Sequence, residues 1–146
     1  MGMTTQGTAV VTGASSGIGA ASAIALAAEG FRVIAAARRV DMLADLAAAH
    51  PGIEPFALDV TNEASVAALV AHLGDDAVSV LVANAGGAYD GASIAQADAT
   101  SWLQSFDVNV LGVVRTVQAL LPKLVDSGAG TILVMGSTAG RIVYEN

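Results

Sequence analysis

The sequence contains no cysteine, and only six lysine and arginine residues stand against thirteen aspartate and glutamate residues. Without cysteine there is neither a disulfide framework nor a thiolate metal ligand. His50 and His72 lack the spacing of metal ligands, so no metal site is expected.

The formal net charge of −7 argues against nucleic acid or an anionic membrane as a partner. No apolar run reaches the roughly 18 residues of a membrane span and no signal-peptide pattern opens the chain, so we expect a cytoplasmic protein.

Strand-like and helix-like patterns alternate along the 146 residues. Strands are expected near 8–12, 32–36, 54–58, 78–83 and 131–135, and helices near 17–29, 40–49, 62–73 and 99–127. Pro51-Gly52 should end the second helix, Thr61 should cap the third, and Pro122 should kink or break the last. The apolar positions from 110 to 124 have helical spacing and should mostly face a sheet. The alternation predicts one α/β domain over 1–146, with βαβ units and a parallel sheet.

A glycine-rich turn, T-G-A-S-S-G-I-G, joins the first expected strand to the first helix. The unpaired N–H groups and the dipole of a helix N-terminus stabilise a pyrophosphate there. Gly13 should permit the tight turn, Gly17 should let the backbone approach a ligand, and Gly19 should let the helix pack close to the sheet. The cofactor-binding candidates of this turn are Gly13, Ser15, Ser16, Gly17, Ile18 and Gly19.

The glycine spacing G-x-x-x-G-x-G differs from the commonest dinucleotide-binding turn and resembles that of the short-chain dehydrogenase/reductase family. Further matches to this family are Asn84-Ala85-Gly86, Asn109-Val110-Leu111-Gly112 and Ser137. The resemblance extends over the whole chain. It implies a Rossmann-type doubly wound parallel sheet with strand order 3-2-1-4-5. It also implies hydride transfer between a nicotinamide cofactor and a small carbonyl/alcohol substrate, by a parent protein that is a homo-oligomer.

Two arginines, Arg38 and Arg39, follow the second expected strand. In dinucleotide-binding folds an acidic residue about 20 residues past the glycine turn holds the ribose 2′-hydroxyl of NAD. Here Ala37 occupies that position, and guanidinium groups bind a 2′-phosphate bidentately. The pair therefore favours NADP(H) over NAD(H). The alternative is two solvated arginines at the start of a helix.

The resemblance assigns further cofactor contacts to the ends of the third and fourth strands. Asp59 would bond the exocyclic amine of adenine and Val60 would lie on the ring face, although Asp59 could instead be a helix N-cap. Asn84 should bond neighbouring backbone and steady the sheet. Ala85 follows it in the motif, and Gly86 should let the backbone approach the cofactor.

Two residues are candidates for proton handling by resemblance. Asn109 would hold a water of a proton relay, and a buried helical asparagine is costly unless bonded; ordinary helix packing is the alternative. Ser137, after the fifth strand, would hydrogen-bond the substrate carbonyl or alcohol, with Thr138 as a rival.

The family's catalytic pair, Tyr-x-x-x-Lys, is missing from the chain. Tyr89 is followed four residues later by Ser93, Tyr144 stands two residues from the end, and the only lysine is Lys123. The expected tyrosine would fall beyond residue 146, so we expect a fragment that covers the first half to three-fifths of an enzyme and is inactive alone. Its fifth strand should be a sheet edge, which favours marginal stability or self-association. A non-catalytic nucleotide-binding module and an inert gene fragment are the alternatives.

Overall fold

A computed structural model describes residues 6–142 and contains one five-stranded parallel sheet. The strands are β1 (Thr8–Thr12), β2 (Arg32–Ala37), β3 (Ile53–Ala57), β4 (Val78–Ala83) and β5 (Thr131–Val134). The helices are α1 (Gly17–Ala28), α2 (Val40–Ala49), α3 (Glu63–Leu73), α4 (Ala99–Phe106) and α5 (Gly112–Asp126). A π-helical segment, Asp107–Leu111, joins α4 to α5, and a 3₁₀ turn covers Thr138–Gly140. The strand order β3-β2-β1-β4-β5 confirms the expected doubly wound sheet.

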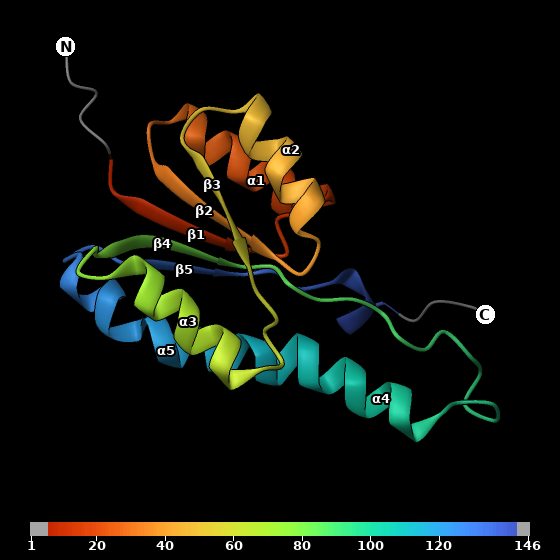
Figure 1. The fold of residues 1–146 in the computed structure, drawn as a ribbon. Coiled ribbons are helices and arrows are strands. Elements are labelled where there is room, and N and C mark those ends of the chain that lie inside the picture. The colour runs from red at the N-terminus through yellow and green to blue at the C-terminus, as the bar shows by residue number, and fades with distance from the viewer. Residues whose placement is uncertain (1–5, 143–146) are drawn as a thin grey trace, which may run out of the picture.

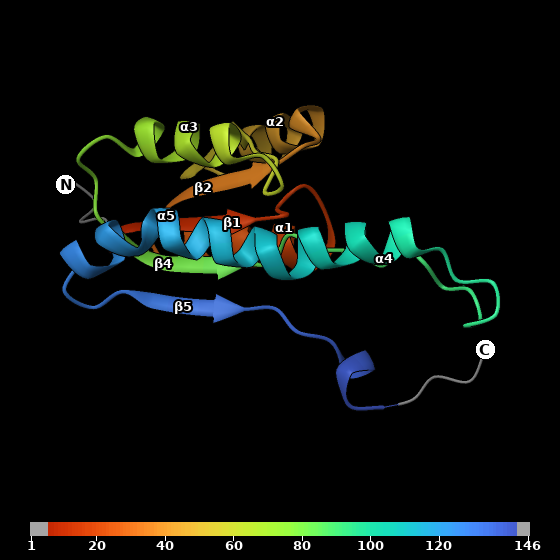
Figure 2. The ribbon, with the colours of Figure 1, turned by 90° about the horizontal axis from the view of Figure 1, so that it is seen from below.

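Helices cover both faces of the sheet: α1 and α2 on one, α3 and α5 on the other (Figure 1). Every residue of β1 is buried, because this strand is central and packed on both faces. Val10 contributes to the core under α3 and α5, whereas its neighbour Val11 contributes to the core under α1 and α2. Both figures show α4 extending past the carboxyl ends of the strands (Figure 2).

One expectation about a helix end is wrong, and another is wrong in part. The N-cap of α3 is Asn62, whose side chain accepts the Ser65 N–H at 3.1 Å, and not Thr61. Pro122 lies inside α5, which runs to Asp126, so the proline does not break the helix; a kink there stays a prediction. A proline removes one helical N–H, but Pro122 is exposed, so water can satisfy the carbonyl left without that partner.

The apolar stripe that runs from the π-helical segment along α5 faces the sheet only in part. Leu120 and Leu124 are buried, but Val110, Val114 and Leu121 are 42%, 44% and 48% exposed. A stripe of seven apolar positions is wider than the side that β4 and α3 cover, and the expectation that most of it is core is therefore wrong for these three residues.

The continuous helical segment from Ala99 to Asp126 is long and apolar enough to cross a membrane by length and composition alone. One such helix is weak evidence, because the core helix of a globular protein passes the same test. Here α5 packs against β4 and α3, and Leu120 belongs to the core.

The strand β5 lies at an edge of the sheet, as expected. All four of its residues are exposed, including Ile132, Leu133 and Val134. An uncovered apolar edge strand favours association, and self-association of the chain stays a prediction.

Candidate nucleotide-binding site

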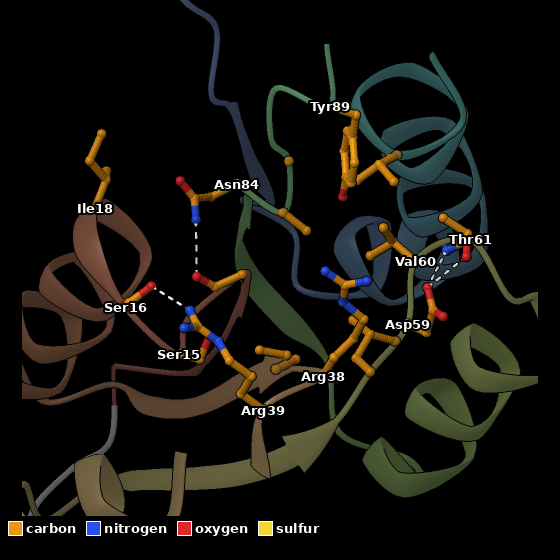
Figure 3. Close-up of a pocket in the computed structure, with 17 residues that line it drawn as sticks. Ser15, Ser16, Ile18, Arg38, Arg39, Asp59, Val60, Thr61, Asn84 and Tyr89 are labelled. Atoms are coloured by element: carbon orange, nitrogen blue, oxygen red, sulfur yellow. Dashed lines mark hydrogen bonds between the residues drawn. The ribbon is translucent and has the colours of Figure 1, made fainter. Parts of the chain in front are cut away.

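A cleft of about 580 Å³ lies where β1, β2, β3 and β4 end (Figure 3). This volume lies within the usual range of small-molecule sites. The cleft is lined by Gly13, Ser15, Ser16, Ile18, Ala36, Ala37, Arg38, Arg39, Leu58, Asp59, Val60, Thr61, Asn84, Ala85, Gly86, Tyr89 and Val108. Eleven of these were candidates from the sequence alone. Ligands of open α/β sheets bind at this carboxyl edge, so the fold explains why the motifs converge.

Close backbone contacts require two of the glycines of the turn, Gly13 and Gly19. Gly13 has a φ of +67°, and a Cβ there would lie 2.9 Å from the Ala85 Cα. A Cβ on Gly19 would lie 2.3 Å from the Gly13 carbonyl oxygen. Gly17 has a φ of +56° with nothing within 4 Å of an added Cβ, which leaves open space at the start of α1. Gly17 and Gly19 shape the turn without lining the cleft themselves.

Asn84 joins the end of β4 to the glycine-rich turn. Its Nδ2 donates to the carbonyl oxygens of Thr12, at 3.1 Å, and Gly13, at 3.3 Å. The Thr12 hydroxyl oxygen accepts the N–H groups of Asn84 and Ala85, both at 3.0 Å. Asn84 therefore bonds neighbouring backbone, as expected.

The two arginines diverge across the cleft (Figure 3). Arg39 turns toward the glycine-rich turn and donates to Ser15 Oγ, from Nε at 3.2 Å and Nη2 at 3.0 Å. Arg39 Nη2 also donates to Ser16 Oγ at 2.6 Å. Arg38 turns instead toward Asp59 and Val60. Both side chains are exposed and line the cleft, to which they bring two positive charges.

Asp59 uses one carboxylate oxygen to hold the chain that follows it. Its Oδ1 accepts the Thr61 hydroxyl at 2.7 Å and the Thr61 N–H at 3.0 Å. The hydroxyl bond chiefly, then the backbone bond, hold the pKa of Asp59 below its usual value, and the charges of Arg38 and Arg115 add to this. Asp59 is therefore ionised at neutral pH, and it is not the N-cap of α3.

Val60 packs closely against α5 because Gly112 of that helix has no side chain. A Cβ on Gly112 would lie 2.6 Å from Val60 Cγ2, so the helix packs directly on this wall of the cleft. Arg115 of the same helix donates to the Val60 carbonyl oxygen at 3.4 Å and pairs with Asp107 at 2.8 Å.

The two candidates for proton handling lie outside the cleft lining. Asn109 is exposed, and not buried as expected, because the π-helical segment carries it beside the loop after β4. Its Oδ1 accepts the Gly87 N–H at 2.9 Å, and its Nδ2 donates to the Gly87 carbonyl oxygen at 2.8 Å. Ser137 follows β5, and its Oγ accepts the Ala139 N–H at 3.1 Å. Their assigned roles stay predictions.

Comparison with models of protein families identifies the family of this chain. The model of the short chain dehydrogenase family matches residues 7–146. The chain belongs to the short-chain dehydrogenase family. An uncharacterised oxidoreductase of Mycobacterium tuberculosis is 51% identical over 147 residues, which cover 98% of this chain and 57% of that protein. The chain thus spans just over half the length of this curated relative.

Two solved structures of dehydrogenases superpose well on the chain. One is the closed form of serine dehydrogenase complexed with NADP⁺, with a TM-score of 0.87 and 32% identity over 94% of this chain and 56% of that one. Another is an alcohol dehydrogenase from the archaeon Thermococcus sibiricus complexed with 5-hydroxy-NADP. Its TM-score is 0.86, with 34% identity over 94% of this chain and 61% of that one.

Six residues that line the cleft were not candidates from the sequence: Ala36, Ala37, Leu58, Thr61, Tyr89 and Val108. The first four stand beside predicted strand ends, so a wider window around each motif would have found them. Tyr89 and Val108 come from the loop after β4 and the π-helical segment, and no sequence signal marks them. Within residues 6–142, no three His, Cys, Asp or Glu side chains could together hold a metal ion.

Proposed function

We propose that this chain is the nucleotide-binding part of an NADP(H)-dependent oxidoreductase acting on a carbonyl/alcohol pair. The observation that carries the cofactor preference is the pair Arg38 and Arg39, both in the cleft directly after β2. Ala37 stands where a carboxylate would bind the 2′-hydroxyl of NAD. The NADP-type ligands named for the two solved relatives support the same preference.

The residues present fit such a cofactor. The tight Gly13–Gly19 contact leaves the start of α1 facing the cleft, where a pyrophosphate is stabilised by the helix dipole and N–H groups. Asp59 keeps its Oδ2 available for an adenine amine, and Val60 supplies an apolar wall. When bound, the nicotinamide supplies the hydride acceptor or donor.

Turnover needs a proton donor or acceptor beside the reacting oxygen. This chain offers Ser137 to orient that oxygen and Asn109 to hold the main chain of Gly87. It contains no Tyr-x-x-x-Lys, and Tyr144 lies outside the described residues. We therefore propose that the chain alone binds the nucleotide without turnover. Carbonyl reduction, a cytoplasmic location and homo-oligomerisation are proposals for the longer protein.

Isothermal titration calorimetry with NADP⁺ and NAD⁺ tests the proposal. Arg38→Ala and Arg39→Ala should each weaken NADP⁺ binding by roughly tenfold or more, because each removes a charge-assisted contact to the 2′-phosphate. NAD⁺ affinity should change by less than about twofold. Arg141→Ala is the matched control, since Arg141 is exposed and outside the cleft lining.

Two results would contradict this reading. Equal affinity of the wild-type chain for NAD⁺ and NADP⁺ would refute the cofactor preference. Consumption of NADPH by the chain with a panel of aldehydes and ketones would refute binding without turnover.

A further inference from the structure

Arg39 donates side-chain hydrogen bonds to the serines of the glycine-rich turn, although it is exposed. Its Nε and Nη2 donate to Ser15 Oγ, and Nη2 reaches Ser16 Oγ at 2.6 Å. An exposed arginine otherwise samples many rotamers and loses that freedom when it binds a ligand. The contacts therefore fix the guanidinium over the glycine-rich turn before any ligand arrives.

The Ser16 side chain does not cap α1, although serine usually caps a helix from this position. It is the N-cap residue of α1, yet its side chain makes no capping hydrogen bond to the helix. Within the described residues, the hydrogen bonds of the Ser15 and Ser16 hydroxyls are those accepted from Arg39. A hydroxyl that accepts in this way still has its own hydrogen to donate.

The resulting group is suited to a phosphate monoester. It presents the hydroxyl of Ser15 and the Nη1 donors of Arg39, which take no part in the serine contacts. A phosphate monoester carries nearly two negative charges and three acceptor oxygens at neutral pH. Donors already polarised by a neighbouring cation make stronger hydrogen bonds than isolated ones.

We infer that Ser16 is a positioning residue: its hydroxyl holds Arg39 in the rotamer that binds a 2′-phosphate, and Ser15 completes the same site. This rests on the proposed function and deepens it, because selectivity then depends on a serine that acts through an arginine. Arg38 instead turns toward Asp59, away from the serines of the turn.

Calorimetry with adenosine 2′,5′-bisphosphate and 5′-AMP on the whole chain isolates the 2′-phosphate. Ser16→Ala should weaken the bisphosphate by about fivefold to tenfold and 5′-AMP by less than about twofold. Ser16→Thr, which keeps the hydroxyl, should retain the affinity. Ser22→Ala on the same helix is the control, because its hydroxyl bonds the Ile18 carbonyl oxygen instead.

A double-mutant cycle tests action through Arg39. In an Arg39→Ala background, Ser16→Ala should add less than about a twofold loss. Independent, multiplying losses would overturn the positioning role, as would equal losses for both nucleotides. If the wild-type chain does not prefer NADP⁺ to NAD⁺, the proposed cofactor preference fails together with this inference. If it does and Ser16→Ala leaves that preference unchanged, only the inference fails.

Discussion

Replacing Gly19 with alanine would place a methyl group inside the glycine-rich turn. An ideal Cβ there lies 2.3 Å from the Gly13 carbonyl oxygen and 2.6 Å from Asn84 Nδ2. Close carbon–oxygen contacts in proteins stop near about 3.3 Å, so α1 and the turn would have to separate by about 1 Å. Because the Gly13 atom belongs to the backbone, no change of rotamer relieves the contact.

The expected cost of Gly19→Ala follows from two opposed effects. Overpacking costs about 1–3 kcal/mol, whereas replacing a helical glycine by alanine gains about 1 kcal/mol in helix propensity. A backbone clash belongs at the upper end of the first range, so the free energy of unfolding should fall by about 1–2 kcal/mol. The displaced turn should also weaken NADP⁺ binding by about tenfold or more.

Urea unfolding followed by circular dichroism measures the stability of Gly19→Ala, and calorimetry measures its affinity for NADP⁺. The matched control is Ala21→Gly at an exposed position of the same helix. It should cost about 1 kcal/mol through helix propensity and leave NADP⁺ affinity unchanged. A Gly19→Ala chain at least as stable as the wild type, with the same affinity, would refute the argument from close packing.

Two further predictions concern stability. Leu120 is fully buried, so Leu120→Ala should lower the free energy of unfolding by about 2–5 kcal/mol, whereas Leu121→Ala on the exposed side should cost less than about 1 kcal/mol; equal losses in urea titrations would contradict this assignment of the core. Arg32 pairs with Glu54 at 2.8 Å and with Asp76 on an exposed surface, so Arg32→Ala should cost about 1 kcal/mol. The Arg32 hydrogen bond lowers the folded-state pKa of Glu54, so this contribution is present at neutral pH and lost as the pH falls through that pKa. An unfolding difference between wild type and Arg32→Ala that persists unchanged at low pH would argue against this pair.

The location of the cleft was predictable because its parts are local in sequence. Gly13, Arg38, Asp59 and Asn84 each stand at or just after the end of a predicted strand. Parallel strands bring their carboxyl ends to one edge, so four local motifs determine one site without knowledge of side-chain packing. The alternation of strands and helices was predictable for the same reason, because the spacing of apolar residues within each segment indicates a strand or a helix.

The surroundings of Asn109 were not predictable from the sequence. Its motif predicted a buried helical asparagine, but the residue lies in a π-helical segment and pairs with Gly87, 22 residues earlier. A single extra residue in a helical turn rotates every later side chain, and nothing in the sequence marks where that turn occurs. Tyr89 and Val108 reach the cleft through the same long-range arrangement of loop and helix.

Helical spacing also could not divide the apolar residues of α5 between core and surface. Leu120 and Leu121 are adjacent and chemically identical, yet one is buried and the other is 48% exposed. The difference depends on which elements cover the helix, here β4 and α3. Periodicity identifies a helix with an apolar face, whereas tertiary packing decides how much of that face is covered.

The residues proposed to bind the nucleotide are separate from those proposed to handle a proton. The cleft is built at the ends of β1 to β4 and carries the arginines and the glycine-rich turn. Asn109 and Ser137 lie outside its lining. Their side-chain oxygens accept hydrogen bonds from the main-chain N–H groups of Gly87 and Ala139. The charge and shape proposed to select a 2′-phosphorylated dinucleotide therefore do not depend on the groups proposed to handle a proton. Binding of the nucleotide can persist where transfer of hydride does not.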